Sequence, residues 1–322
     1  MTRVAVLDDW QKVARQSADW SALEARAEVS FLESAFADQD AAAAALADVE
    51  IILSMRERTA FPAALVARLP KLRMFGMTGR RAAAIDSAAL MRQGVTVCWT
   101  EGGSGAETAE LALALMLAAA RRLPAADAAI RAGGFQAGTV PGFQLAGKTL
   151  GIIGLGRLGS LMAGYGRALG MELLAWSPHL TAERAALAGV TLASKEGLLA
   201  QADVVSLHLV LAESTRGIIG AAELARMKPG AVLVNTSRGP LVEEPALLAA
   251  LESGRLIATL DVFDREPLPP EHPLRSAPNT VLTPHLGYGT VEIYATFYRQ
   301  SVENALAFLD GKPIRVLAPP PG

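Results

Sequence analysis

The sequence has one cysteine, almost no net charge and no long apolar run, and each shortage excludes a class of protein. Cys98 is the single cysteine in 322 residues, which excludes a disulfide framework and a cysteine metal site. The 30 basic and 32 acidic residues are dispersed along the chain, so no basic stripe exists for a phosphate backbone. We therefore expect a cytoplasmic protein that binds neither nucleic acid nor a metal through cysteine.

The apolar runs are too short for a membrane protein. Near the N-terminus, Val4 to Leu7 is followed at once by Asp8 and Asp9, whereas a signal peptide needs a longer apolar stretch. The strongest run, Leu111 to Ala120, is about half of the ~20 residues that span a bilayer. We expect neither a signal peptide nor contact with a membrane.

The composition is that of a well-buried globular protein with two domains. Hydrophobic residues make up 51% of the chain and charged residues 19%, and 322 residues exceed the size of one ordinary core. In the first part, short apolar runs alternate with Ala-rich helical segments, which predicts a parallel sheet. The expected strands are Val4 to Leu7, Glu50 to Ser54, Leu72 to Met77 and Val95 to Trp99.

A second alternating unit follows a long apolar helix. The helix is expected at Glu107 to Arg122, with Pro124 after its end. The glycine-rich stretch 133–147 then leads into further strands, and a last helix is expected at Val291 to Asp310. These strands are Leu150 to Ile153, Glu172 to Trp176, Val204 to Leu207, Val232 to Asn235, Ile257 to Leu260 and Val281 to Leu282. The predicted fold class is α/β, with two doubly wound parallel sheets.

A glycine-rich turn marks a candidate nucleotide site. Gly154, Gly156 and Gly159 form G-x-G-x-x-G between an apolar strand and a helical segment. The first glycine permits a tight turn, the second lets the backbone approach a pyrophosphate, and the third lets helix and strand pack closely. A tight turn without a ligand is the alternative, but the strand before it and the motifs after it favour a dinucleotide.

The residue expected to select the dinucleotide is a serine. About 20 residues after such glycines, NAD-binding folds place an acid on the ribose 2′-hydroxyl, and here that position is Ser177. A serine does not repel a 2′-phosphate, so the cofactor is NAD or NADP. Arg184 and His179 could meet such a phosphate or simply face solvent, and Arg157 does not discriminate.

Three side chains in short fixed contexts describe a reduction site. Arg238 lies in N-T-S-R-G-P, Glu266 in D-V-F-D-R-E-P and His285 in T-P-H-L, each after a predicted strand. A guanidinium grips a carboxylate in two parallel hydrogen bonds, an imidazole exchanges a proton with a hydroxyl, and a carboxylate orients that imidazole. The alternative for Arg238 is a surface salt bridge. His179, His208 and His272 lack such contexts and are interpreted as structural.

With these motifs the sequence resembles the D-isomer-specific 2-hydroxyacid dehydrogenases across nearly the whole chain. The resemblance implies that Arg238 binds and polarises a keto acid, that His285 is the acid/base supported by Glu266, and that Asp261 holds the nicotinamide carboxamide. The remaining residues assigned to the cofactor by this resemblance and by the glycine motif are Gly154, Gly156, Arg157, Leu158, Gly159, Ser177, Thr236 and Ser237.

The same resemblance implies a discontinuous architecture. Residues 1–100 and 290–322 would form a flavodoxin-like substrate domain, and residues 101–289 an inserted Rossmann domain for NAD(P). A site in the cleft between them, closed by a hinge, would exclude water. Members of the family are commonly dimers through the segment that corresponds to Glu107 to Arg122, although burial within one chain would explain its apolar character equally well.

Three departures from the family pattern concern the ligands. The substrate loop reads Gly79-Arg80-Arg81 where small residues are common, which together with Arg56 predicts a cationic substrate pocket. Val210 stands where a proline is frequent, and Ser177 replaces the ribose-binding acid. The expected substrate is a small 2-keto or 2-hydroxy acid such as glyoxylate or hydroxypyruvate.

Two rival functions remain at this point. One is a dinucleotide-sensing binding protein or corepressor on the same fold, which would lack turnover. The other is a formate-type dehydrogenase, which is disfavoured because that branch has glutamine where this chain has Glu266.

Overall fold

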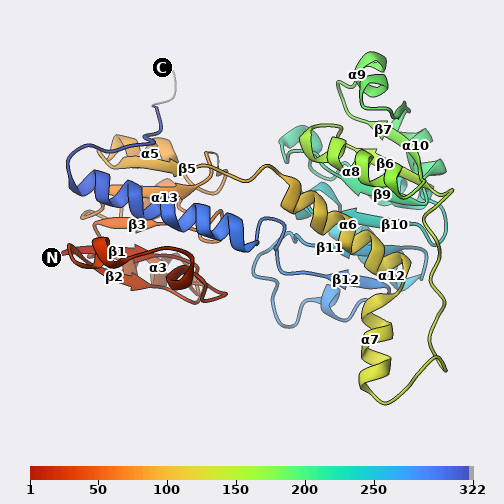
Figure 1. Ribbon diagram of the computed structural model, residues 1–322, viewed down its shortest axis with the longest axis horizontal. Helices are drawn as coiled ribbons and strands as arrows, with labels where there is room; N and C mark the ends of the chain where they lie inside the picture. Colours follow the sequence, from red (N-terminus) through yellow and green to blue (C-terminus); the bar gives the residue numbers. More distant parts are fainter. Residues whose placement is uncertain (81, 319–322) are drawn as a thin grey trace. The chain divides into compact units, whose positions relative to one another are not determined.

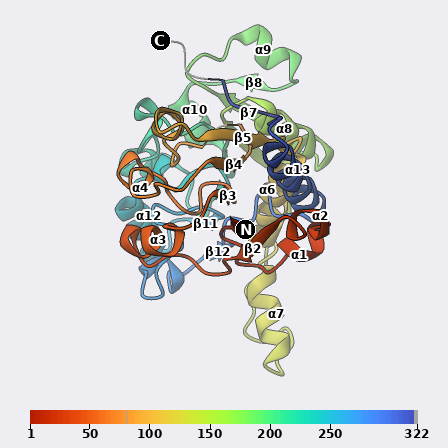
Figure 2. The same cartoon turned by 90° about the vertical axis from the view of Figure 1, so that its left-hand side faces the viewer.

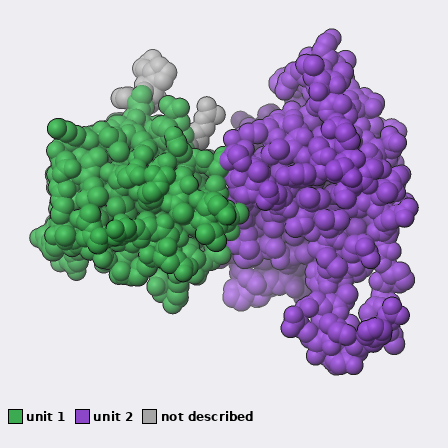
Figure 3. All heavy atoms as spheres, viewed as in Figure 1, with its two compact units in different colours: residues 1–103, 289–322 green, residues 104–288 purple. Residues whose placement is uncertain are grey.

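The computed structural model describes residues 1–80 and 82–318 and divides into two compact α/β units. Unit 1 comprises residues 1–103 and 289–322, and unit 2 comprises residues 104–288 (Figure 3). The chain therefore leaves the first unit once and returns to it with its last helix. Arg81 and residues 319–322 lie outside the described residues.

Unit 1 is built on a five-stranded parallel sheet with the order β2-β1-β3-β4-β5, the flavodoxin-like arrangement. Figure 2 shows α3 and α4 on one face of the sheet and α1, α2 and α13 on the other. Its strands are β1 (Thr2–Val6), β2 (Ala27–Phe31), β3 (Ile51–Leu53), β4 (Met74–Thr78) and β5 (Thr96–Thr100). Its helices are α1 (Ala14–Ser17), α2 (Ser21–Glu24), α3 (Gln39–Leu46), α4 (Ala63–Val66), α5 (Ser87–Arg92) and α13 (Val291–Leu309).

Unit 2 is built on a seven-stranded parallel sheet with the order β12-β11-β10-β9-β6-β7-β8. The strands are β6 (Thr149–Ile153), β7 (Glu172–Trp176), β8 (Thr191–Leu192), β9 (Val204–Leu207), β10 (Val232–Asn235), β11 (Ile257–Leu260) and β12 (Thr280–Leu282). Because strand order reverses between β6 and β9, a ligand crevice is expected at the carboxyl ends of these two strands.

Helices cover both faces of the second sheet (Figure 1). Helices α6 (Ala106–Ala120) and α8 (Arg157–Ala168) bury their apolar sides on one face. The other face is covered by α10 (Lys195–Gln201), α11 (Ala221–Arg226) and α12 (Glu244–Glu252). The remaining helices are α9 (Ala182–Leu187), α7 (Leu123–Arg131) and the 3₁₀ turns η1 (Glu213–Thr215), η2 (Gly239–Leu241) and η3 (Pro273–Arg275).

These two sheets confirm the predicted fold class, and three elements were not predicted. Strand β2 is an edge strand in which Glu28 and Ser30 alternate with apolar residues, so it has no continuous apolar run. Strand β8 has only two residues. Helix α7 contains Pro124 in its first turn, where proline fits a helix, so the proline begins this helix instead of only following α6. No helix in the described part of the chain is long and apolar enough to cross a membrane.

Candidate active site

The glycine-rich turn joins β6 to α8, is closely packed at Gly154 and Gly159 and is open at Gly156. Gly154 has φ +103°, and a Cβ there would lie 2.6 Å from the carbonyl carbon of His208. A Cβ on Gly159 would lie 2.2 Å from the carbonyl oxygen of Gly154, so helix and strand approach too closely for a side chain. A Cβ on Gly156 would meet no atom within 4 Å, so the start of α8 has open space beside it. A bare backbone at a helix N-terminus fits a pyrophosphate.

Ser177 follows β7 and is tied to this turn. Its Oγ accepts the backbone N–H of Leu155 at 2.9 Å, so the hydroxyl has a structural partner within the turn. Arg184 donates from Nη1 to the carbonyl oxygen of His179 at 3.3 Å. The two residues named as candidates for contact with a 2′-phosphate therefore contact each other. Arg157 and Leu158 are the first residues of α8 and lie beside Gly105.

Arg238 follows β10 in a turn that Asn235 shapes. Asn235 Oδ1 accepts the N–H of Ser237 at 3.1 Å, and its Nδ2 donates to the carbonyl oxygen of Arg238 at 2.9 Å. The Arg238 guanidinium donates to the carbonyl oxygen of Ser237 at 2.7 Å. Gly239 then packs against the next loop, since a Cβ there would lie 2.2 Å from the carbonyl carbon of Phe263.

His285 and Glu266 form the pair that their chemistry predicts. Nδ1 of His285 and Oε2 of Glu266 are 2.5 Å apart, and both side chains are about 30% exposed. The other carboxylate oxygen of Glu266 accepts the N–H of Phe263 at 2.8 Å, which fixes the carboxylate. The imidazole lies edge-on to the ring of Tyr288 at 5.8 Å. Since Nδ1 is engaged with Glu266, a proton exchange through this imidazole would have to use Nε2.

Asp261 is fully buried and organises the loop that carries His285. Its Oδ1 accepts the Thr283 hydroxyl at 2.6 Å and the Leu286 N–H at 2.7 Å, and its Oδ2 accepts the Gly287 N–H at 2.8 Å. Burial raises the pKa of Asp261, and these hydrogen bonds oppose the rise. This supporting role for the His285 loop was not predicted. The expected contact of Asp261 with a nicotinamide carboxamide stays a prediction.

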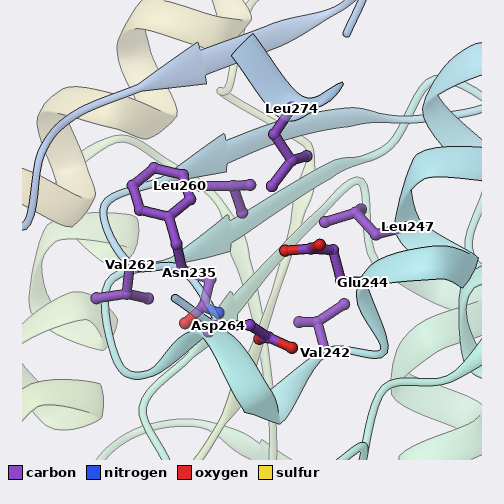
Figure 4. A pocket seen from close by; sticks show the side chains of 10 residues that line it. Asn235, Val242, Glu244, Leu247, Leu260, Val262, Asp264 and Leu274 are labelled. Carbon is purple, nitrogen blue, oxygen red and sulfur yellow. The ribbon is translucent and has the colours of Figure 1, made fainter. Parts of the chain in front are cut away.

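These residues share one edge because they follow three neighbouring strands. Strands β12, β11 and β10 are consecutive in the sheet, and they are followed by His285, by Asp261 with Glu266, and by Arg238. A small pocket lies behind the loops after β10 and β11, and Figure 4 shows Val242, Leu247, Leu260 and Leu274 in its lining. Asn235, Glu244 and Asp264 add polar groups to this lining.

The expected substrate residues lie in unit 1, at the carboxyl ends of β3 and β4. Arg56 donates from Nη1 to the carbonyl oxygen of Thr78 at 3.0 Å, directly beside Gly79. Gly79 has φ +90°, and its N–H donates to Thr100 Oγ1 at 3.2 Å. The Arg80 guanidinium lies over the Trp99 ring, 4.8 Å from its centroid. Arg81 lies outside the described residues.

A polar cluster at the same end of unit 1 was not predicted. Arg58 donates from Nη1 to the carbonyl oxygen of Asp8 at 2.6 Å and from Nη2 to the Tyr294 hydroxyl at 3.2 Å, and it lies over the ring of Trp10. Asp8 is buried and accepts the Thr59 hydroxyl at 2.8 Å. Burial raises the pKa of Asp8 to about 6. These contacts join segments far apart in the sequence, so no local motif reveals them.

A glycine-rich turn at a sheet switch point, with a histidine–carboxylate pair and an arginine at the neighbouring strand ends, is typical of dinucleotide-dependent oxidoreductases. Residues 113–287 match the model of the D-isomer specific 2-hydroxyacid dehydrogenase NAD binding domain. The chain belongs to the D-isomer specific 2-hydroxyacid dehydrogenase family.

Its relatives carry different substrate names. A glyoxylate reductase of Aeropyrum pernix is 40% identical over 256 residues, which are 77% of this chain and 76% of that protein. A D-3-phosphoglycerate dehydrogenase of Archaeoglobus fulgidus is 37% identical over 262 residues, 81% of this chain and 50% of that protein. The chain thus spans about half the length of the curated phosphoglycerate dehydrogenases that it matches. A solved phosphoglycerate oxidoreductase from Vibrio cholerae o395 is 36% identical with a TM-score of 0.91, over 97% of this chain and 100% of that one.

Proposed function

We propose that the protein is an NAD(P)-dependent dehydrogenase that interconverts a small 2-keto acid and its 2-hydroxy acid. The observation that carries this proposal is the His285–Glu266 pair, 2.5 Å apart, on the sheet edge that also presents Arg238. A sensor of dinucleotides needs no proton donor at this position, whereas reduction of a carbonyl does.

The chain's residues divide the chemistry as follows. Arg238 binds the substrate carboxylate and polarises the keto oxygen, because a guanidinium offers two parallel donors. His285 donates a proton from Nε2 to that oxygen during reduction and accepts it back during oxidation. Glu266 stabilises the protonated imidazole and fixes its orientation through Nδ1. When bound, a nicotinamide cofactor would supply the hydride for C2 of the substrate, or take it up in the reverse direction.

The cofactor assignment covers NAD and NADP. The glycine turn of unit 2 supports a dinucleotide, and Gly154, Gly156, Arg157, Leu158 and Gly159 would surround its pyrophosphate. Ser177 carries no charge that would oppose a 2′-phosphate, so we propose that NADPH is accepted comparably with NADH. Asp261 and the Thr236-Ser237 segment would lie toward the nicotinamide.

Unit 1 would supply the substrate contacts. Gly79 would offer backbone N–H groups to the carboxylate, and Arg56, Arg80 and Arg81 would make the pocket cationic. The preferred substrates would then be small acids of the glyoxylate and hydroxypyruvate kind, with a gain for those that carry a second negative group.

We further propose a homodimer. Helix α6 buries one side within its own unit, and α7, which follows it, has no buried residue and extends away from the rest of unit 2 (Figure 1). Its Leu123 and Ile130 are 53% and 52% exposed, and Phe135 after it is 75% exposed. Apolar side chains gathered on such an extension mark a contact surface.

The test is a nicotinamide absorbance assay with a panel of 2-keto acids, run with NADH and with NADPH. His285→Ala should lose about 10² to 10⁴ in kcat while it retains the wild-type Kd for the cofactor. If the wild type bound the cofactor but turned over none of the 2-keto acids, the proposal would be contradicted. A dinucleotide-sensing protein would then be favoured. A His285→Ala protein with wild-type turnover would remove His285 from the mechanism.

A further inference from the structure

Three residues continue the strands β9, β10 and β11 by one position and form a row across the sheet edge. Leu207 pairs with Asn235, and Asn235 pairs with Leu260, so the following residues His208, Thr236 and Asp261 are level with one another. The ladders extend this far, since His208 N–H donates to the Ile153 carbonyl oxygen at 2.8 Å and Asp261 N–H donates to that of Asn235 at 3.0 Å.

The row lies on the face of the sheet that α6 and α8 cover. Val204, Val232 and Ile257 belong to the apolar core on this face, and side chains alternate along a strand. Counting in steps of two from these residues leads to His208, Thr236 and Asp261. The three side chains are therefore expected on the same face, below the N-terminal ends of the two helices.

Two polar atoms in this row lack a partner. Asp261 is fully engaged by its own loop, and Nε2 of His208 is 2.9 Å from the Ser206 hydroxyl. Within residues 1–80 and 82–318, however, Nδ1 of His208 and Oγ1 of Thr236 are buried without a hydrogen bond. Thr236 is 6% exposed. An unsatisfied buried polar atom costs about 1 to 3 kcal/mol, so two on neighbouring strands point to a ligand.

The row begins at the glycine turn. Gly154 packs against the backbone carbonyl group of His208, so His208 directly follows the strand that borders the glycine turn. Ser177, where the adenosine ribose is expected, follows β7 on the far side of β6. The half of a dinucleotide beyond the pyrophosphate would therefore cross the ends of β9, β10 and β11, which is where the row lies.

We propose that His208 and Thr236 form a hydrogen-bonding seat for a hydroxyl of the ribose in the nicotinamide half of the cofactor. The proposal rests on the proposed dinucleotide function and adds His208, which its sequence context left without a role. A sugar hydroxyl both donates and accepts, and so matches one imidazole nitrogen and one threonine hydroxyl.

The state of the imidazole supports a hydroxyl over a phosphate. Burial lowers the pKa of His208 to about 4, so the ring is neutral at pH 7 and brings no positive charge. A phosphate would favour a charged donor, whereas a sugar hydroxyl needs none. In this arrangement the ribose would lie over the ends of β9 and β10, and the nicotinamide would lie further along the row, near Asp261.

The test compares the binding of the whole cofactor with the binding of its adenosine half. It uses the variants Thr236→Val and His208→Phe and the control variant Thr259→Val. Thr259 is also a buried threonine of this sheet, and its hydroxyl donates to the Leu233 carbonyl oxygen at 3.4 Å. Kd is measured for NADH and for ADP, which lacks the second ribose, together with the Tm of each ligand-free protein.

Thr236→Val and His208→Phe should each raise the Kd for NADH about 5- to 100-fold, the range for the loss of one buried hydrogen bond. The Kd for ADP should change less than about twofold. Ligand-free Thr236→Val should keep or raise its Tm, because an apolar isostere replaces an unsatisfied hydroxyl. Thr259→Val should leave both Kd values unchanged.

Equal losses of affinity for NADH and for ADP would overturn the proposed ribose contact. The two side chains would then contact the pyrophosphate or have a purely structural role. An unchanged Kd for NADH in both variants would also overturn the ribose contact. Failure of the proposed function is a different result, namely no binding of NADH or NADPH by the wild type. The seat therefore fails only in a protein that binds cofactor.

Discussion

Replacing Asp261 by asparagine tests whether this buried carboxylate holds the His285 loop in place. The carboxylate accepts three hydrogen bonds, from the Thr283 hydroxyl and from the N–H groups of Leu286 and Gly287. Asparagine keeps the shape but has one oxygen. With that oxygen toward Thr283 and Leu286, the amide NH₂ faces the Gly287 N–H, and a buried donor is left without an acceptor.

The expected loss of unfolding free energy is about 1 to 3 kcal/mol, the cost of one orphaned buried donor. Burial raises the pKa of Asp261, so removing its charge recovers part of the cost of burying that charge. The loss of unfolding free energy should therefore lie near the lower end of this range. The loop would also shift relative to Glu266, so kcat should fall while the Kd for NADH changes little. Urea unfolding, steady-state reduction and cofactor titration measure the three quantities.

The matched control is Thr283→Val, which removes one donor and leaves the carboxylate with two backbone partners. Thr283→Val should lose about 0.5 to 1.5 kcal/mol of unfolding free energy, the net contribution of one hydrogen bond. Wild-type stability and wild-type kcat in Asp261→Asn would refute the loop-holding role. Unchanged stability with weaker NADH binding would instead support a direct contact with the nicotinamide carboxamide.

Three further changes probe the substrate grip, the cofactor choice and unit 1. Arg238→Lys should lower kcat/KM at least tenfold in steady-state assays, because an ammonium lacks the planar fork, and wild-type values would contradict this role. Ser177→Asp should shift the ratio of the NADPH and NADH Kd values toward NADH by about 1 to 3 kcal/mol, whereas an unchanged ratio would exclude contact with the 2′ position. The pKa of Asp8 rises from 3.8 to about 6, so the unfolded state loses this proton first as pH increases. Wild-type unfolding free energy should therefore fall by about 2 kcal/mol between pH 4 and 6, and urea unfolding of Asp8→Asn should not show that fall.

Strands in the interior of the sheets were predictable because they are continuous apolar runs. The runs at Glu172–Trp176, Val204–Leu207 and Val232–Asn235 are strands with the expected bounds. Edge strands carry a weaker signal. In β2, Glu28 and Ser30 face away from the core, and a run of five alternating residues within an Ala-rich region also suits a helix.

The candidate catalytic side chains could be picked out from the sequence because each lies in a short motif after a strand, whereas the residues that support them could not. Asp261 holds residues 25 and 26 positions further along the chain, and Asp8 accepts a hydroxyl 51 positions away. Such pairs form only when strands distant in sequence become neighbours. Arg58 shows the same limit, since its partners Asp8 and Tyr294 come from two distant segments of the chain.

The loops after β10, β11 and β12 form one connected support from Arg238 to His285. Asn235 fixes the turn that carries Arg238, and Gly239 packs directly on the backbone of Phe263. The N–H of Phe263 fixes Glu266, which in turn holds His285. Each link depends on the one before it, so the arginine and the imidazole are positioned by the same packed loops. A side chain at Gly239 would collide with the backbone of Phe263 and Asp264 and separate these loops, so their packing requires glycine after the arginine.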